Sequence, residues 1–210
     1  GERAGVALPQ TSMSEEDRKE RGIRDRLLEI NKIAATYYYR QLRSENGKAG
    51  LDYLKKRELS DSTINSFGLG YATQSTGNLY KLLKDKGYDD DILKESGLFT
   101  YERGIHEKFW NRVIFPIMDI NNKVIGFGGR VMGDAKPKYL NSPETRLFDK
   151  SRNLYGLNIA RTSRKPNMII CEGYMDVISM HQAGFNQAVA SLGTAHLSQD
   201  STYDTHVPFQ

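Results

Sequence analysis

The chain has 210 residues, of which 38% are hydrophobic and 27% are charged, and its formal net charge at pH 7 is +4. These proportions are ordinary for a soluble protein of one large or two small domains. The sequence contains no apolar run of about 18 residues, which argues against a membrane span, and residues 1–13 lack the apolar centre of a signal peptide. The single cysteine, Cys171, excludes an internal disulfide and favours a reducing, cytoplasmic location.

The charges are distributed unevenly along the chain. Residues 102–165 hold 13 Lys and Arg against 6 Asp and Glu, whereas residues 166–210 hold four carboxylates and no Lys or Arg. A basic segment followed by an acidic one suits a protein that binds phosphates on one side and a divalent cation on the other. An ordinary soluble surface with uneven charge fits equally well, so charge alone leaves both interpretations open.

The first predicted elements are a linker and a long helix. Residues 1–13 contain Gly, Pro and small residues, which is typical of a linker. Because the chain does not begin with Met, we expect it to be a fragment or a processed form of a longer protein. Ser14 followed by acidic residues predicts a capped helix start. Apolar residues then recur at three- and four-residue steps to about Leu42, which predicts one amphipathic helix.

Shorter helices are predicted to follow. Gly50–Arg57 is the first, and Ser60 is placed to cap the second, Asp61–Phe67. Two more fit Leu79–Lys86 and Asp89–Ser96, each followed by glycine. Residues 14–98 are therefore predicted to be a helical region joined by short turns.

The pattern then becomes β-rich. Arg112–Ile120 and Lys123–Val131 are predicted strands, and the Asn pair between them tolerates the positive φ angles of a tight hairpin. Pro116 cannot donate a ladder hydrogen bond, so it predicts an edge strand or a bulge. Residues 133–150 are rich in Lys, Pro, Asn and Ser and are predicted to form a loop.

The last part of the chain is predicted to alternate strands and helices. Asn153–Arg161 is predicted to be a helix, Met168–Cys171 a buried strand, Tyr174–Gln182 a helix and Ala188–Ala190 a second buried strand. A strand–helix–strand order implies a parallel, right-handed crossover. The fold class predicted for the whole chain is α+β / α/β, with a helical and β-hairpin subdomain followed by the start of a parallel α/β unit.

Two segments could bind phosphates. Gly126–Arg130 places three glycines beside an arginine, so that a backbone could approach a ligand closely, but it lacks the ending of a P-loop and fits a glycine-rich bulge as well. Lys136–Glu144 carries two lysines on a loop stiffened by two prolines. A solvated surface loop is the alternative for this segment.

Glu172 is the most informative acidic residue. It follows an apolar run and precedes a glycine, which places it at the carboxyl end of a strand, where α/β folds position their chemistry. Asp176 lies four residues further on, about one helical turn away. The alternative roles are a helix cap for Glu172 and a surface acid for Asp176. The four histidines have no spacing typical of a zinc site, and we assign them no metal.

Taken together, these segments resemble the catalytic core of bacterial DNA primase. The similarity covers roughly residues 1–195, and each motif is modest alone, but many occur in order along the chain. The segments that carry it are Ala34–Tyr39, Phe67–Ala72, Asn111–Ile117, Val124–Arg130, Lys138–Thr145, Leu154–Leu157, Glu172–Val177 and Ala188–Ala195.

The resemblance implies two subdomains and a metal-assisted nucleotidyl transferase. Residues 14–165 match the mixed helical and β subdomain, and residues 166–210 match the start of a Toprim subdomain. The matching glutamate, Glu172, is implied to be catalytic and a ligand of Mg²⁺ or Mn²⁺, with Asp176 as a second possible ligand. The positions implied to line the nucleotide and template groove are Arg112, Arg130, Lys138, Tyr139 and Asn141.

The resemblance also implies partners. The family makes short RNA primers on single-stranded DNA from ribonucleoside triphosphates, and it contacts the replicative helicase through a separate C-terminal domain. Zinc belongs to a separate N-terminal module that this sequence does not contain. The implied protein is a cytoplasmic monomer.

The sequence departs from the family in its last residues. No Asp-x-Asp pair follows Glu172, and Asp200 and Asp204 are not spaced as that pair. The tail from about residue 196 does not resemble the family, so we expect a truncated Toprim part without the full metal site. One alternative is a non-catalytic fragment that binds single-stranded DNA or nucleotide phosphates. Another is a piece of a Toprim nuclease or topoisomerase, which the Lys138–Thr145 loop disfavours.

Overall fold

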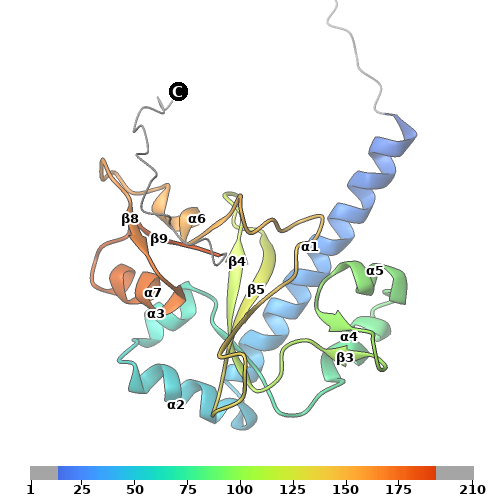
Figure 1. The fold of residues 1–210 in the computed structure, drawn as a ribbon, viewed down its shortest axis with the longest axis horizontal. Coiled ribbons are helices and arrows are strands. Elements are labelled where there is room, and N and C mark those ends of the chain that lie inside the picture. Colours follow the sequence, from blue (N-terminus) through green and yellow to red (C-terminus); the bar gives the residue numbers. More distant parts are fainter. Residues whose placement is uncertain (1–13, 193–210) are drawn as a thin grey trace, which may run out of the picture.

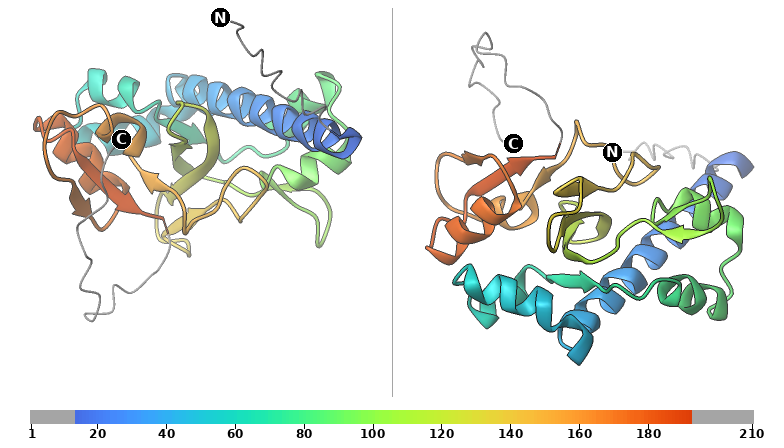
Figure 2. Two further views of the ribbon diagram at one scale, coloured as in Figure 1. Left: turned by 90° about the horizontal axis from the view of Figure 1, so that it is seen from above. Right: turned by 60° about the horizontal axis from the view of Figure 1, so that its bottom comes forward.

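The computed structural model describes residues 14–192, so the predicted linker at 1–13 and the predicted atypical tail from about 196 lie outside the described residues. A four-stranded antiparallel sheet forms the centre of the molecule, and a long helix crosses it (Figure 1). A small three-stranded sheet lies at one end of the four-stranded sheet, and the short helices α4 (Asn78–Asp85) and α5 (Asp90–Glu95) lie at the other end (Figure 2). One continuous hydrophobic core connects these parts. No helix within residues 14–192 is long and apolar enough to cross a membrane.

The long helix α1, Glu15–Leu42, confirms the first predicted helix. Ser14 and Asp17 form a capping box at its start, because each side chain bonds to the backbone N–H of the other residue. The buried side chains follow the predicted apolar stripe, and Asn31 joins them. Its amide donates a hydrogen bond to the carbonyl of Val124, which ties α1 to the sheet.

The predicted short helices are present. They are α2 (Lys48–Lys56), α3 (Asp61–Ser66), α4 (Asn78–Asp85) and α5 (Asp90–Glu95), and a 3-10 turn, η1 (Glu45–Gly47), precedes them. Ser60 caps α3 as predicted, through a hydrogen bond from the N–H of Thr63. The prediction that residues 14–98 are helical was wrong at Gly70–Ala72, which forms β1. Beyond that region, β2 (Phe99–Thr100) and β3 (His106–Glu107) are strands of two residues each.

The central sheet has the order β1-β4-β5-β6. β4, Arg112–Met118, and β5, Val124–Val131, form the predicted antiparallel hairpin. At the turn, Asn122 adopts the predicted positive φ, at 60°. The prediction of an edge strand or a bulge at Pro116 is confirmed locally: β1 pairs only as far as Ile114, and the ladder with β5 shifts register between Ile117 and Met118.

Two predictions for the following segment were wrong. The predicted loop at 133–150 contains β6, Tyr139–Asn141, which adds a strand to the open side of β5. The predicted helix Asn153–Arg161 is instead a two-residue strand, β7 (Leu154–Tyr155), followed by the short helix α6 (Leu157–Ala160). Gly156 between them has φ 83°, a left-handed conformation that interrupts a continuous helix.

The C-terminal unit, residues 169–191, contains β8 (Ile169–Cys171), α7 (Tyr174–Gln182) and β9 (Ala188–Ser191). β8 and β9 pair in parallel, as the strand–helix–strand order predicted. The prediction that β8 is buried was wrong, because the sheet order is β7-β9-β8 and β8 is its edge strand. The side chain of Ile170 is 59% exposed, whereas β9, in the middle, is buried as predicted along Ala188–Ala190.

Candidate functional site

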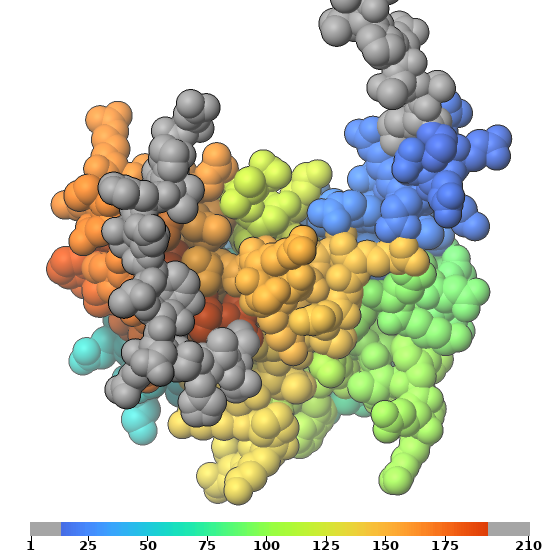
Figure 3. Space-filling model, turned by 45° about the horizontal axis from the view of Figure 1, so that its top comes forward, coloured from blue at the N-terminus to red at the C-terminus, as the bar shows by residue number. Residues whose placement is uncertain are grey.

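A groove of about 810 Å³ lies between the central sheet and the C-terminal unit. Figure 3 shows the chain that follows β5 beside the C-terminal unit on this side of the surface. Both subdomains line the groove, which brings together residues that are far apart in the sequence. The lining residues are Arg57, Lys108, Tyr139, Leu140, Asn141, Pro143, Lys150, Glu172, Gly173, Tyr174, Met175, Asp176, Ala190, Ser191 and Leu192.

The acidic wall of the groove is formed where β8 ends and α7 begins. Glu172 follows β8 directly, Gly173 occupies the position before α7, and Asp176 lies in the first helical turn. The fold thus brings Glu172 and Asp176 to one groove at the carboxyl end of a parallel strand. Their carboxylate oxygens are of the kind that hard divalent cations prefer. Within residues 14–192 no group of three or more His, Cys, Asp or Glu side chains is placed to hold a metal ion.

Three cations line the groove: Arg57 after α2, Lys108 between β3 and β4, and Lys150 after β6. Sequence reasoning missed all three as groove residues. For Lys108 and Lys150 a signal was available, because both belong to the basic segment 102–165. Burial lowers the pKa of Lys108, and the nearby charge of Lys150 lowers it further. The two lysines are therefore close to each other in the groove, and a bound anion would relieve the repulsion between their charges.

Two of the sequence-predicted binding residues, Tyr139 and Asn141, line the groove from β6. The ring of Tyr139 is 40% exposed and stacks on Tyr174, with ring centroids 6.4 Å apart. Burial raises the pKa of the Tyr139 hydroxyl, so it stays a neutral hydrogen-bond donor near pH 7. An exposed ring beside cations is suited to stacking against a flat ligand.

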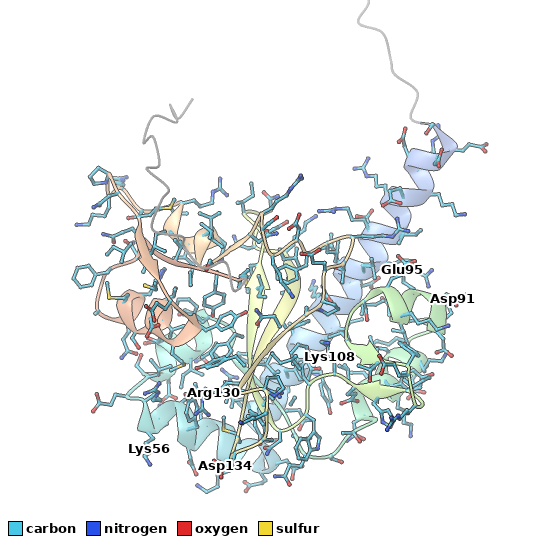
Figure 4. The ribbon with its side chains drawn as sticks, in the orientation of Figure 1. Lys56, Asp91, Glu95, Lys108, Arg130 and Asp134 are labelled. Carbon is cyan, nitrogen blue, oxygen red and sulfur yellow. The ribbon has the colours of Figure 1, made fainter. Side chains whose placement is uncertain are left out.

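Arg130 and Lys138 are not among the lining residues. The guanidinium of Arg130 lies over the ring of Tyr53 in α2, 4.2 Å from its centroid, and donates a hydrogen bond to the carbonyl of Val131. Its Nε is buried without a hydrogen-bond partner. Figure 4 shows Arg130 at the end of the hairpin that is close to α2. Lys138 is exposed immediately before β6.

Arg112 is not among the lining residues either. Its side chain is buried, and its guanidinium donates hydrogen bonds to the carbonyls of Gly129 and Lys138, over 3.2 and 3.4 Å. Burial lowers its pKa. Arg112 thus links β4 to β5 and to the residue before β6.

Tyr174 attaches the acidic wall to the central sheet. Its ring stacks on Phe115 with centroids 4.9 Å apart and planes at 9°. Gly128 leaves room for this ring, because a Cβ at position 128 would lie 2.5 Å from Oη and 2.7 Å from Cε2 of Tyr174. The hydroxyl of Tyr174 donates a 2.8 Å hydrogen bond to Oδ1 of Asn141. Nδ2 of Asn141 in turn donates a 2.9 Å hydrogen bond to the carbonyl of Leu192. Asn141 therefore connects both sides of the groove.

Two family models match the chain. The model described as the DNA primase catalytic core, N-terminal domain, matches residues 37–161. The model of the Toprim domain, a domain that typically binds divalent metal, matches residues 167–204. The order of the two matches follows the division between the central part of the fold and the C-terminal unit.

Curated relatives agree with these matches. A DNA primase of Clostridium acetobutylicum is 50% identical over 173 residues, which cover 81% of this chain and 29% of that protein. A DNA primase of Deinococcus radiodurans is 49% identical over 174 residues, covering 80% of this chain and 30% of that protein. The chain thus spans less than a third of the length of these relatives.

Solved structures share the fold. The DnaG primase catalytic domain bound to single-stranded DNA is 39% identical, with a TM-score of 0.76 over 84% of this chain and 56% of that chain. The RNA polymerase domain of Mycobacterium tuberculosis primase DnaG, in complex with a double-stranded DNA oligomer with a 6-nucleotide overhang, is 36% identical, with a TM-score of 0.78 over 81% of this chain and 55% of that chain.

Proposed function

The chain belongs to the DnaG-type bacterial DNA primase family, and from this premise we propose that its groove holds single-stranded DNA and ribonucleoside triphosphates during the synthesis of short RNA primers. The groove that carries this proposal has cations of the first subdomain on one side and the carboxylates of Glu172 and Asp176 on the other. This charge arrangement suits nucleotidyl transfer, which depends on positioning and charge neutralisation rather than on covalent catalysis.

The proposed division of labour follows from the side-chain chemistry. Arg57, Lys108 and Lys150 neutralise phosphates of the template or of the incoming nucleotide, with Arg130 and Lys138 nearby. The Tyr139 ring stacks against a base or a ribose. Asn141 acts mainly by holding the two sides of the groove together, since both its amide oxygen and its amide nitrogen are already hydrogen-bonded.

Glu172, with Asp176, would hold Mg²⁺ or Mn²⁺. The donor type fits these hard cations, and the two acids contribute only part of the six or so oxygen ligands that they take. A bound divalent cation supplies charge neutralisation at the triphosphate and activation of a hydroxyl group. The protein's own contribution is to keep these carboxylates at a fixed position relative to the phosphate-binding cations.

Primer synthesis tests the catalytic role of Glu172. The longer protein that contains this segment is incubated with a single-stranded template, ribonucleoside triphosphates and Mg²⁺, and the products of the unaltered protein and of the Glu172→Gln variant are compared. We expect the variant to lose primer synthesis while it retains DNA binding. Primer synthesis that survives the substitution would contradict the assigned role.

A second function, binding without polymerisation, is favoured for the chain by itself. The observation behind it is that only two carboxylates within residues 14–192 line the groove, and no Asp-x-Asp pair follows Glu172 in the sequence. In this case the chain binds single-stranded DNA in a salt-dependent manner but makes no primers. The same assay on the chain alone separates the two functions, since primer formation would exclude the binding-only function.

A further inference from the structure

The helix α7 extends from the groove to the connection between α2 and α3. Its first residue, Tyr174, lines the groove, and its last residue, Gln182, contacts the connection. The amide nitrogen of Gln182 donates a 2.9 Å hydrogen bond to the carbonyl of Glu58, and its amide oxygen accepts a 2.8 Å hydrogen bond from the N–H of Ser60. One side chain therefore holds two backbone groups on either side of Leu59.

This connection determines where Arg57 lies. Arg57 is the C-cap residue that follows α2. The next residue, Glu58, has φ 61°, a left-handed conformation that glycine normally occupies after a helix. A residue other than glycine keeps this conformation only when its surroundings fix it. Two backbone hydrogen bonds at the helix end, from the N–H of Glu58 to the carbonyl of Lys55 and from the N–H of Leu59 to the carbonyl of Leu54, supply part of this restraint. The hydrogen bond from Gln182 to the Glu58 carbonyl and the buried side chain of Leu59 add to it from outside the helix.

The side chain of Arg57 has few restraints of its own. It is exposed, no ion pair within residues 14–192 involves it, and its nearest aromatic contact, the ring centroid of Tyr53, is 6.0 Å from Cζ. Its position in the groove therefore depends on the backbone from which it projects. That backbone is joined to α7 through Gln182.

We propose that Gln182 is a positioning residue that holds Arg57 at the groove so that the guanidinium binds a phosphate of single-stranded DNA. The inference rests on the proposed function of the groove as a DNA-binding surface. It adds that α7 connects the acidic wall to the segment that carries Arg57. The acidic residues lie near its first turn, and its last residue, Gln182, binds the backbone of Glu58 and Ser60. Ordering the backbone beforehand reduces the entropy cost of binding, because less of the chain has to be fixed by the ligand.

A double-mutant cycle on single-stranded DNA binding tests this role. Gln182→Met keeps the approximate size of the side chain and removes both hydrogen bonds, and Arg57→Ala removes the guanidinium. We measure the dissociation constant of a labelled oligothymidylate at low salt for both single variants and the double variant. Thermal denaturation of each variant verifies that it is folded, and Gln182→Asn, which retains the amide but is too short to reach both groups, replaces Gln182→Met if that variant melts below the assay temperature.

The expected result is non-additivity. Gln182→Met weakens DNA binding by about threefold in the unaltered background and by less than about 1.5-fold in the Arg57→Ala background, because residues that act through one another do not contribute independently. A merely structural role would give the same loss in both backgrounds. Gln187→Met is the matched control, since the Oε1 atom of Gln187 is buried without a partner and the residue does not line the groove.

Equal losses in the two backgrounds, or no loss in either, would overturn the proposal. Arg57→Ala without effect would also overturn it, because Gln182 would have no residue to act through. The proposed function falls only if substitutions of Lys108 and Lys150 also leave DNA binding unchanged. The two failures can therefore be told apart.

Discussion

The hydroxyl of Tyr174 donates a 2.8 Å hydrogen bond to Oδ1 of Asn141, and this bond joins the first residue of α7 to the edge strand of the central sheet. Because Glu172 lies two residues before Tyr174, the bond also fixes the acidic wall of the groove relative to Tyr139 on the same strand as Asn141. Contacts between the two subdomains thus determine the geometry of the groove.

Removal of the Tyr174 hydroxyl tests this attachment. Burial raises the pKa of Tyr174 further above its ordinary value, so its hydroxyl remains protonated and can donate a hydrogen bond at neutral pH. Tyr174→Phe keeps the ring and leaves Oδ1 of Asn141 without this donor, which should lower the free energy of unfolding by about 1–2 kcal/mol. Urea denaturation measures the change. As a matched control, Tyr80→Phe removes a hydroxyl that donates to Asp90 over the same 2.8 Å outside the groove. An unchanged free energy of unfolding in Tyr174→Phe would contradict the assignment.

Gly128→Ala should be strongly destabilising, because its Cβ would overlap the ring of Tyr174 and the sheet and α7 would have to separate. Overpacking of this kind costs about 1–3 kcal/mol. Gly22→Ala is the control: Gly22 lies in α1, and a Cβ there meets nothing within 4 Å. That substitution should raise stability by about 0.5–1 kcal/mol, since alanine favours the helix. Equal thermal midpoints for the two variants would refute the close packing at Gly128.

Glu107 makes stability depend on pH. Its carboxylate accepts hydrogen bonds from the backbone N–H groups of Leu79 and Tyr80 at the start of α4, yet burial raises its pKa above the ordinary value of 4.5. Because the folded state then binds its proton more tightly than the unfolded state, this group's contribution is most favourable below the ordinary pKa and decreases as pH rises through the raised value.

The measurement is the free energy of unfolding across this window. Relative to Glu107→Gln, the unaltered chain should lose stability as the pH rises from below the ordinary pKa of 4.5 through the raised pKa of Glu107. A constant difference between the two proteins would show that the carboxyl does not titrate differently on folding. Glu107→Ala removes the acceptor for the N–H groups of Leu79 and Tyr80. This variant should be less stable than the unaltered chain and than Glu107→Gln at acidic pH, by about 1 kcal/mol.

Local patterns in the sequence predicted the elements that local physics determines. The apolar stripe of α1, the caps at Ser14 and Ser60, the β4–β5 hairpin and the β8–α7–β9 unit depend on neighbouring residues, and each is present where it was predicted. Glu172 at the end of β8 followed from the same kind of reasoning. Its role at a metal site is still a prediction that rests on the family resemblance.

The sequence did not predict features that depend on pairing between distant segments. β1 and β6 are three residues long and acquire their structure from β4 and β5. The exposure of β8 follows from its place at the edge of the sheet, which apolar residues alone could not reveal. The burial of Arg112 could not be predicted, since the carbonyls that accept its hydrogen bonds belong to Gly129 and Lys138, outside its own strand. Arg57 was missed because every other lining residue lies at least 51 positions further along the chain.

The most direct measurement of the central claim is the salt dependence of single-stranded DNA binding. The unaltered chain is compared with a variant in which Arg57, Lys108 and Lys150 are replaced by alanine and with a control in which Lys19, Lys81 and Lys86, outside the groove, are replaced. The groove variant should bind more weakly at low salt, and the slope of log K against log salt should become shallower by about 2–3, whereas the control should stay close to the unaltered chain. Equal losses of affinity in the two variants would contradict the claim that DNA binds in the groove, because the loss would then follow from the change in net charge alone.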